Sequence, residues 1–347
     1  MNTGHLTPGE VADAAAVFLA KQWNETVTVE EVEKIFGGAS RETFRLKLRV
    51  GDASRGVILR RDPPSSLIDT ERRLEYGAYR AVYGSQVPVP EPLFLEEDPK
   101  WMGRPFSVME EIVGCGTDVS GLDADGRERI GRQKWSIMGE LATMDPLALG
   151  FDQFTEVPAL DACGLRELDY WAGVIEQDEI HPQPVARAAI RWLRRNMPPP
   201  AQKLSIVHGD FRTGNFLFSP NEGIKGILDW EMCHLGDPLE DLAWSLDPLW
   251  NWGMPDLAGR LLPHDEAIAI WKDASGLDCN RSAFHWWRIF VAVKAVAIWI
   301  SSSEDFHGGA SKEAVLAYAG WVMTDRENRI LLDYLSPESR HEFGELA

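Results

Sequence analysis

A short polar segment between two apolar runs constrains this chain more than any other feature. Residues 207–215 read V-H-G-D-F-R-T-G-N, and Asp229 follows at the end of the next apolar run. Hard divalent cations take oxygen ligands, and magnesium is usually held by a few protein groups together with phosphate oxygens. Asn215 and Asp229 therefore form a candidate magnesium site for a nucleoside triphosphate, and Asp210 is the candidate acceptor of the proton from an attacking hydroxyl.

The same residues carry a resemblance to known families. The spacing H-x-D-x-x-x-x-N from His208 to Asn215 parallels the protein-kinase catalytic loop, and Asp229 stands where that family has a metal-binding aspartate. The reading H-G-D, the later D-W-E that begins at Asp229, and G-D-P-L-E-D-L-A at residues 236–243 resemble the aminoglycoside phosphotransferase (choline kinase-like) family. Within it, the chain is most similar to the branch found fused to, or beside, acyl-CoA dehydrogenases.

The resemblance implies a two-lobed, protein-kinase-like α+β fold. A small N-terminal lobe, residues 1–112, would hold an antiparallel sheet with one main helix and bind nucleotide. Residues 113–347 would form a larger, mainly helical lobe for catalysis and substrate binding. Patterning along the chain favours the same division, because residues 44–50 alternate with the period of a strand, whereas six segments after residue 124 have helical spacing.

Three neighbours of the polar segment allow more than one role. His208 braces the loop by hydrogen bonding or transfers a proton, and the kinase-like resemblance favours the brace. Glu231 either approaches the metal or stands behind it as a supporting acid. Asp241 is expected to order the loop or to cap a helix.

The nucleotide phosphates are expected to meet a glycine turn and a cationic side chain. Gly37, Gly38 and Ser40 lie in a turn between two predicted strands, where glycine permits close backbone approach and serine offers a donor. Arg60 ends the third strand at the place where the wider kinase pattern has a lysine, and an arginine fork also contacts phosphate oxygens. Arg61 is the alternative, since alternation places it on the opposite face.

Two further nucleotide contacts follow from the resemblance. Glu75 on the predicted helix would pair with Arg60, with Glu71 as the alternative. The hinge that reads the purine base would include Glu110 and Ile112, which recognise the base through the backbone.

Composition excludes several classes of function. The net charge of −19 argues against a nucleic-acid-binding face. The most apolar run, residues 289–300, is interrupted by Lys294 and is too short to span a bilayer, so we expect a buried helix and no membrane partner. No signal peptide is visible, and the four cysteines are widely separated, which favours a cytoplasmic protein with reduced thiols.

We therefore expect an ATP- and Mg²⁺-dependent phosphotransferase that moves the γ-phosphoryl group to a hydroxyl of a small molecule, in particular a metabolic hydroxy compound such as a hydroxy acid or its CoA ester. The alternatives are an aminoglycoside or macrolide kinase and a non-catalytic nucleotide-binding pseudokinase. A protein acceptor is disfavoured because no A-P-E segment follows Asp229.

Overall fold

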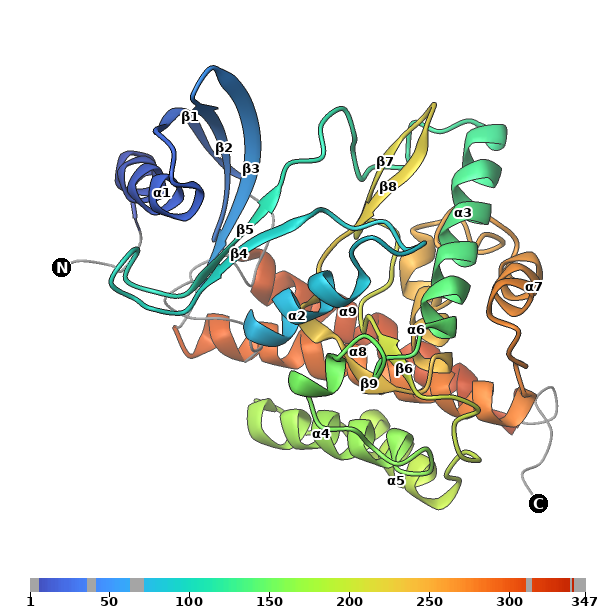
Figure 1. Ribbon diagram of the computed structural model, residues 1–347. Coiled ribbons are helices and arrows are strands. Elements are labelled where there is room, and N and C mark those ends of the chain that lie inside the picture. The colour runs from blue at the N-terminus through green and yellow to red at the C-terminus, as the bar shows by residue number, and fades with distance from the viewer. Residues whose placement is uncertain (1–5, 36–41, 63–71, 310–313, 338, 340–347) are drawn as a thin grey trace.

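The chain folds into a small sheet-based lobe and a larger helical lobe, as expected (Figure 1). The structure is a computed structural model that describes residues 6–35, 42–62, 72–309, 314–337 and 339. Gly37, Gly38 and Ser40 of the predicted phosphate-covering turn lie outside these residues, as does Glu71. The predicted lobe boundary at residue 112 falls just after the last strand of the sheet.

The first lobe is built on a five-stranded antiparallel sheet in the order β1-β2-β3-β5-β4. Its strands are β1 (Val27–Ile35), β2 (Glu42–Val50), β3 (Ala53–Arg61), β4 (Pro92–Glu96) and β5 (Phe106–Glu110). Phe44 and Leu46 pair in register with Leu59 and Val57, and all four side chains are fully buried. Burying side chains of this size stabilises a fold by about 1.5–3 kcal/mol each, which fixes the register of β2 against β3.

Helix α1 (Pro8–Trp23) packs on this sheet, beside β1. Thr7 caps it, since its hydroxyl accepts from the Glu10 N–H while the Glu10 carboxylate accepts from the Thr7 N–H. That reciprocal arrangement satisfies two backbone donors at the helix end. The apolar residues Val11, Ala15, Phe18 and Leu19 lie on one face of the helix and belong to the core of the lobe.

Helix α2 (Arg72–Val82) lies between the two lobes rather than only on the sheet. Ala78, Tyr79 and Val82 belong to the core of the helical lobe, whereas the polar side of the helix faces β3. The sequence predicts this helix as a partner of the sheet, and its apolar face proves to pack largely on the other lobe.

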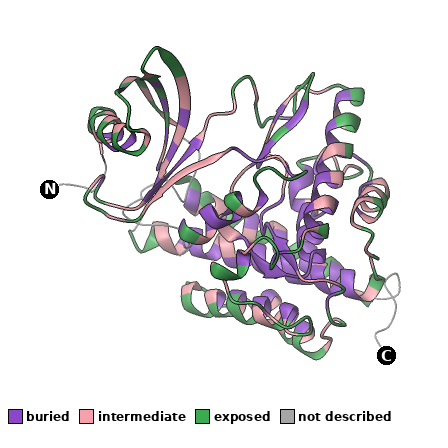
Figure 2. Ribbon diagram, viewed as in Figure 1, coloured by how far each residue is buried: buried purple, intermediate pink, exposed green. Residues whose placement is uncertain are grey.

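The second lobe is organised around α8 (Arg281–His307), most of whose side chains are buried (Figure 2). The other helices are α3 (Ala124–Thr143), α4 (Cys163–Asp178), α5 (Pro184–Arg195), α6 (Leu239–Ser245), α7 (His264–Ser275) and α9 (Ala314–Tyr334). Helices α4 and α5 are separated by a short connection between Asp178 and Pro184. Pro184 begins the second helix, in keeping with the preference of proline for the first turn.

Among the residues that the structure describes, α8 alone is long and apolar enough to cross a membrane by length and composition. Its most apolar window is 83% buried inside the protein. A core helix passes the same test, and the burial of α8 agrees with the helix predicted there.

Two short antiparallel strand pairs lie where the lobes meet, and the second of them is a hairpin. The first pairs β6 (Ser205–Val207) with β9 (His234–Gly236), and the second pairs β7 (Phe216–Ser219) with β8 (Gly223–Ile227). The 208–215 loop connects β6 to β7, and Asp229 follows β8. The β7–β8 hairpin thus brings the two halves of the predicted site together, since Asn215 directly precedes it and Asp229 follows it.

Candidate active site

The 208–215 loop is held by a single carboxylate from α6. The N–H groups of His208 and Gly209 donate to the two oxygens of Asp241, at 2.7 and 2.9 Å. Hydrogen bonds to an ionised carboxylate are stronger than neutral ones, and here they fix two consecutive peptide groups. Asp241 therefore orders the loop, which is one of the two roles predicted for it.

Glycine is required at position 209 by both conformation and space. Its φ is +82°, in the region that side chains disfavour. A Cβ atom there would lie 2.3 Å from the carbonyl oxygen of Met232. The loop can therefore pass close to the backbone before β9 only because this residue has no side chain.

His208 braces the loop from inside. Its Nε2 lies 2.8 Å from the carbonyl oxygen of Leu228, and its Nδ1 accepts the N–H of Asp210 at 3.1 Å. This pairing requires a neutral ring with its proton on Nε2. Burial lowers the pKa of His208 to about 4, so the ring stays neutral at physiological pH. The bracing role predicted for His208 accounts for both of its ring nitrogens.

The carboxylate of Asp210 is surrounded by hydrogen-bond donors from neighbouring side chains. Oδ1 accepts the indole N–H of Trp244 at 2.7 Å and lies 3.3 Å from Nε of Arg212, while Oδ2 accepts from Nδ2 of Asn215 at 2.5 Å. Burial raises the pKa of Asp210, and the Arg212 cation offsets part of that rise. A carboxylate whose pKa is raised is a better proton acceptor than an ordinary surface aspartate.

Asn215 and Asp229 approach the same region from the two ends of the β7–β8 hairpin, Asn215 directly before β7 and Asp229 shortly after β8. Asn215 uses Nδ2 for both of its side-chain bonds to Asp210, so its amide oxygen is the atom suited to a metal. Asp229 adopts a left-handed conformation with φ +69°, and its N–H donates to the hydroxyl of Tyr79 at 3.0 Å. Strained backbone of this kind is concentrated at functional sites.

Arg60 lies across the junction between the lobes. Its guanidinium donates to Glu75 Oε1 at 2.5 Å and to Asp229 Oδ1 at 3.0 Å. Glu75 on α2 is thus the helix partner of Arg60, as the sequence predicts. Because the guanidinium is only 13% exposed, these ion pairs are shielded from water and hold the side chain toward the site.

Arg61, the alternative phosphate contact, faces the other side of the sheet. Its guanidinium pairs with Glu42 and donates to the carbonyl oxygen of Met102 at 2.8 Å. The two arginines therefore separate as strand alternation requires. Arg60, and not Arg61, faces Asp229.

The predicted hinge follows β5 without a break. The N–H groups of Glu110 and Glu111 donate to the carbonyl oxygens of Glu91 and Gly56, at 2.9 and 3.1 Å. The side chain of Ile112 lies over Gly226, where a Cβ atom would come within 2.5 Å of Ile112 Cδ1. Ile112 thus packs the hinge against the β7–β8 hairpin.

Two side chains at the site were not singled out from the sequence. Trp244 supplies a donor to Asp210, and Tyr79 supplies the acceptor for the Asp229 N–H. A weak signal for Trp244 exists, since it lies three residues after Asp241 and so on the same face of α6. Nothing in the local pattern distinguishes Tyr79 from a core residue. Glu231 lies in the turn after Asp229, and its contact with a metal stays a prediction.

The donor set suits a hard cation beside a proton acceptor. Asn215 offers an amide oxygen and Asp229 a partly exposed carboxylate, which are the ligands that Mg²⁺ accepts from proteins. Asp210 stands next to them, and Arg60 brings a planar cation to the same place. The arrangement can therefore hold a metal and a phosphate chain next to an acceptor for a proton.

Comparison with known proteins agrees with this geometry. Residues 31–274 match the family described as the phosphotransferase enzyme family, APH. Acyl-CoA dehydrogenase family member 10 of Mus musculus is 30% identical over 218 residues, which cover 60% of this chain and 19% of that protein. Family member 11 of Rattus norvegicus is 27% identical over 282 residues, which cover 79% of this chain and 34% of that protein. The chain thus spans about a third or less of the length of both relatives.

Solved structures show the same fold. A candidate aminoglycoside phosphotransferase from Ralstonia eutropha superposes with a TM-score of 0.71 at 21% identity, covering 93% of this chain and 97% of that one. A thermostable variant of aminoglycoside phosphotransferase APH(4)-Ia, solved with ADP and hygromycin B, gives 0.60 at 16% identity and covers 93% and 99%. With the family match extending over more than half of its length, the chain belongs to the phosphotransferase enzyme family, APH.

Proposed function

We propose that the protein transfers the γ-phosphoryl group of ATP to a hydroxyl of a small metabolic molecule. The observation that carries the proposal is the Asp210 carboxylate, held by Trp244 and Asn215 in a loop that lies next to Asp229 and Arg60. In-line phosphoryl transfer needs positioning and neutralisation of charge more than covalent chemistry, and these groups supply both.

Each residue has a distinct part in the proposed reaction. Asp210 orients the acceptor hydroxyl and takes its proton. Asn215 and Asp229 would hold Mg²⁺, which when bound neutralises charge on the β- and γ-phosphates. Arg60 contacts phosphate oxygens, and its bond to Glu75 keeps the guanidinium in place. The backbone of Glu110 and Ile112 would receive the base, and residues 37–40 would cover the phosphates.

The acceptor is proposed to be a small hydroxy acid or its CoA ester. Helix α6 begins at Leu239, soon after Asp229, which leaves no room for a long activation segment. Arg212 brings a cation within 3.3 Å of Asp210 Oδ1, and its guanidinium stacks 5.0 Å from the ring centroid of Trp250. A cation beside the proton acceptor favours an acceptor with negative charge over a polycationic antibiotic. The relatives named after acyl-CoA dehydrogenases are consistent with this preference.

An antibiotic acceptor is the second candidate. It is favoured by the fold shared with the aminoglycoside phosphotransferase that was solved with hygromycin B. A single panel of acceptors decides between the two: hydroxy acids, hydroxyacyl-CoA esters, aminoglycosides and macrolides, each with Mg-ATP.

The measurement is the release of ADP, with the Asp210→Asn protein as control. We expect release that depends on a hydroxy acid or its CoA ester and is lost in the control. Release only with an antibiotic would overturn the acceptor class. Binding of Mg-ATP without release in any reaction would indicate a nucleotide-binding module without catalysis.

A further inference from the structure

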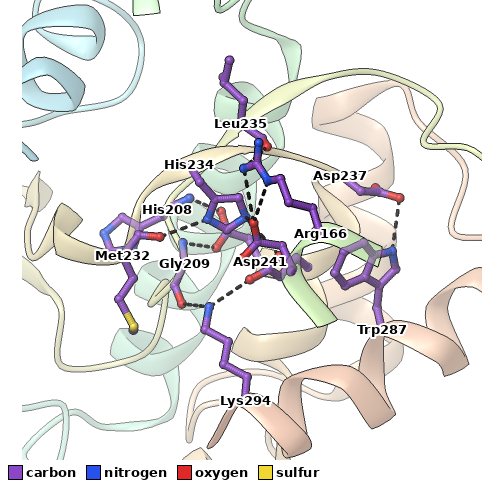
Figure 3. Close-up of polar contacts among 12 residues, drawn as sticks. Arg166, His208, Gly209, Met232, His234, Leu235, Asp237, Asp241, Trp287 and Lys294 are labelled. Atoms are coloured by element: carbon purple, nitrogen blue, oxygen red, sulfur yellow. Dashed lines mark hydrogen bonds and ion pairs between the residues drawn. The ribbon is translucent and has the colours of Figure 1, made fainter. Parts of the chain in front are cut away.

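A fully buried lysine reaches the backbone next to Asp210 from the far side of the loop. Nζ of Lys294, on α8, lies 2.7 Å from the carbonyl oxygen of Gly209 and 2.9 Å from Oε1 of Glu240 (Figure 3). That carbonyl belongs to the peptide group that joins Gly209 to Asp210. The side chain of Lys294 is 1% exposed, so its contacts with Gly209 and Glu240 are made without water.

The Gly209–Asp210 peptide group is held at both of its polar atoms. Its oxygen accepts from Lys294, and its N–H donates to Nδ1 of His208 at 3.1 Å. Glycine gives little resistance to rotation about its own bonds, so this plane would be free to tilt without the two contacts. A tilt changes φ of Asp210 and thus the direction of its carboxylate.

Lys294 also contacts the side chain that holds the Asp210 carboxylate. Its ammonium lies 5.1 Å from the ring centroid of Trp244 and 5.5 Å from that of Trp171. A cation at this distance from a desolvated indole is attracted to the ring. Because the Trp244 N–H donates to Asp210, one lysine supports both the backbone and the side chain of that residue.

A chain of buried charges keeps the ammonium in place. The second oxygen of Glu240 lies 3.1 Å from Nε2 of His234, which is also 3.7 Å from Oε1 of Glu167. Nδ1 of the same ring faces the carbonyl oxygen of Met232 at 3.1 Å, so both ring nitrogens meet acceptors. Burial alone would lower the pKa of His234, but the two carboxylates outweigh it and raise that pKa to about 9.

Glu167, His234 and Glu240 have ligand atoms close enough together to hold a metal ion. Their neighbours favour a proton instead. Arg166 donates to the Glu167 oxygen that would be a ligand, and Lys294 already pairs with Glu240. A divalent cation would add further positive charge between these two side chains, whereas an imidazolium satisfies both carboxylates.

We propose that Lys294 is a positioning residue for Asp210, which fixes the Gly209–Asp210 peptide group through its carbonyl oxygen while Glu240 holds the ammonium. The effect of Lys294 on turnover rests on the proposed function, whereas its effect on the order of the 208–215 loop does not. Asp241 and Lys294 then hold the loop from α6 and α8, through its N–H groups and through its carbonyl oxygen.

The test separates positioning from simple stability. Lys294→Met removes the donor and one of the two cations that pair with the buried Glu240, so the protein should be destabilised. Adding Glu240→Gln removes one charge of each sign, and we expect the double variant to recover most of the lost thermal midpoint. Turnover should stay reduced by about 10- to 100-fold in the double variant, with the KM for ATP within about twofold, because the carbonyl still has no donor.

Two control variants accompany the double variant. Glu240→Gln alone keeps the Lys294 donor but removes the carboxylate that holds the ammonium, so turnover should lie between that of the wild type and that of the double variant. Trp287→Phe removes a buried hydrogen bond, 3.1 Å long, from the same helix to Asp237 (Figure 3). It should lower the thermal midpoint without changing turnover, because its partner is not in the loop.

Hydrogen exchange of the 207–215 peptide gives a readout that needs no acceptor. Exchange should be faster than in the wild type for the double variant and unchanged for Trp287→Phe. If the wild type transfers no phosphoryl group to any acceptor, the proposed function fails and this exchange measurement still decides the role of Lys294. Recovery of wild-type turnover, or of wild-type exchange, in the double variant would overturn the proposal.

Discussion

Both oxygens of Asp210 are already engaged before any acceptor arrives. Trp244 and Arg212 approach Oδ1, and Asn215 donates to Oδ2. A carboxylate offers about four lone-pair sites, so these contacts leave room for roughly one more donor. The remaining site suits a single hydroxyl, and its direction is set by three side chains, two from the 208–215 loop and one from α6.

Asp210→Asn tests this residue with little change of shape. The amide cannot take a proton, so kcat should fall by about 10²- to 10⁴-fold, the range typical of a lost general base. The dissociation constant for Mg-ATP should stay within a few-fold of the wild type, measured by calorimetry. Equal losses in binding and in kcat would show instead that the residue supports the nucleotide.

Gly209→Ala tests the close approach between the loop and Met232. The new methyl group would have to sit 2.3 Å from a carbonyl oxygen at a φ of +82°, so the free energy of unfolding should drop by at least about 1–3 kcal/mol. Gly173→Ala on α4 is the matched control, because nothing lies within 4 Å of its added Cβ. Denaturant unfolding should show that the control is neutral or slightly stabilised.

At the scale of elements, two buried carboxyl groups lie where the segment after α6 meets helix α9, and their charges interact. Asp247 caps the short helix Pro248–Asn251, and Glu327 projects from α9 with both oxygens buried and without a hydrogen bond among the described residues. Burial raises the pKa of Asp247 to about 7, and burial with the charge of Asp247 raises that of Glu327 well above its ordinary value. The fold therefore prefers these groups protonated.

The pH dependence of stability follows from the sign of these shifts. An acid whose pKa is raised on folding destabilises the fold as pH rises from its unfolded value, near 4, to its folded value, near 7. Glu327→Gln should therefore raise the thermal midpoint by several degrees at pH 8 and by much less at pH 5. Asp325→Asn, on the exposed side of α9, should show no such dependence. A pH-independent gain for Glu327→Gln would contradict the shift.

At the scale of the whole molecule, the contacts between the lobes meet at Asp229. Arg60 contacts Asp229 from the sheet, and Tyr79 contacts it from α2. Asp229 itself follows the β7–β8 hairpin of the helical lobe. Any ligand that uses the Asp229 carboxylate must therefore affect both lobes together. The stability of the whole protein should report such binding.

Mg-ATP should raise the free energy of unfolding by about 2.7 kcal/mol when its concentration is a hundredfold above the dissociation constant. Removal of the metal with EDTA should abolish most of that gain. Asp229→Ala should show little gain with or without metal, in thermal unfolding followed at fixed nucleotide concentration. The same gain in Asp229→Ala as in the wild type would contradict the assignment of Asp229 as a metal ligand.

The fold class and the pairing of Arg60 with Glu75 were predictable from the family resemblance, and the patterning along the chain favours the same fold. Alternation along β3 separates Arg60 from Arg61, and helical spacing places Glu75 toward the sheet. The loop was predictable from its spacing alone. His208 and Asp241 were also predicted as supports of the loop, but Trp244 and Lys294 were not, since they lie 34 and 85 residues beyond the groups that they contact.

The position of α2 shows a second limit of prediction from the sequence. Its apolar residues are spaced as for any helix that packs on a sheet, and only the tertiary structure decides which lobe receives them. Tyr79 looks like core in the pattern, and it is core, yet its hydroxyl also meets the Asp229 N–H. Aromatic side chains with a polar tip can serve both roles, and local pattern does not separate them.

The bond from Lys294 to Gly209 also bears on the order in which the protein matures during synthesis. The loop leaves the ribosome long before α8, which supplies its last support and is followed only by α9 among the described helices. Contacts between residues so distant along the chain form late, after the intervening segments have collapsed. A nascent chain that stops before α8 would carry every residue of the predicted site, from Gly37 to Asp229, and would still lack the donor that holds the Gly209 carbonyl oxygen. The phosphotransferase would thus become competent only after α8 has been synthesised, and chains truncated before α8 would be inactive.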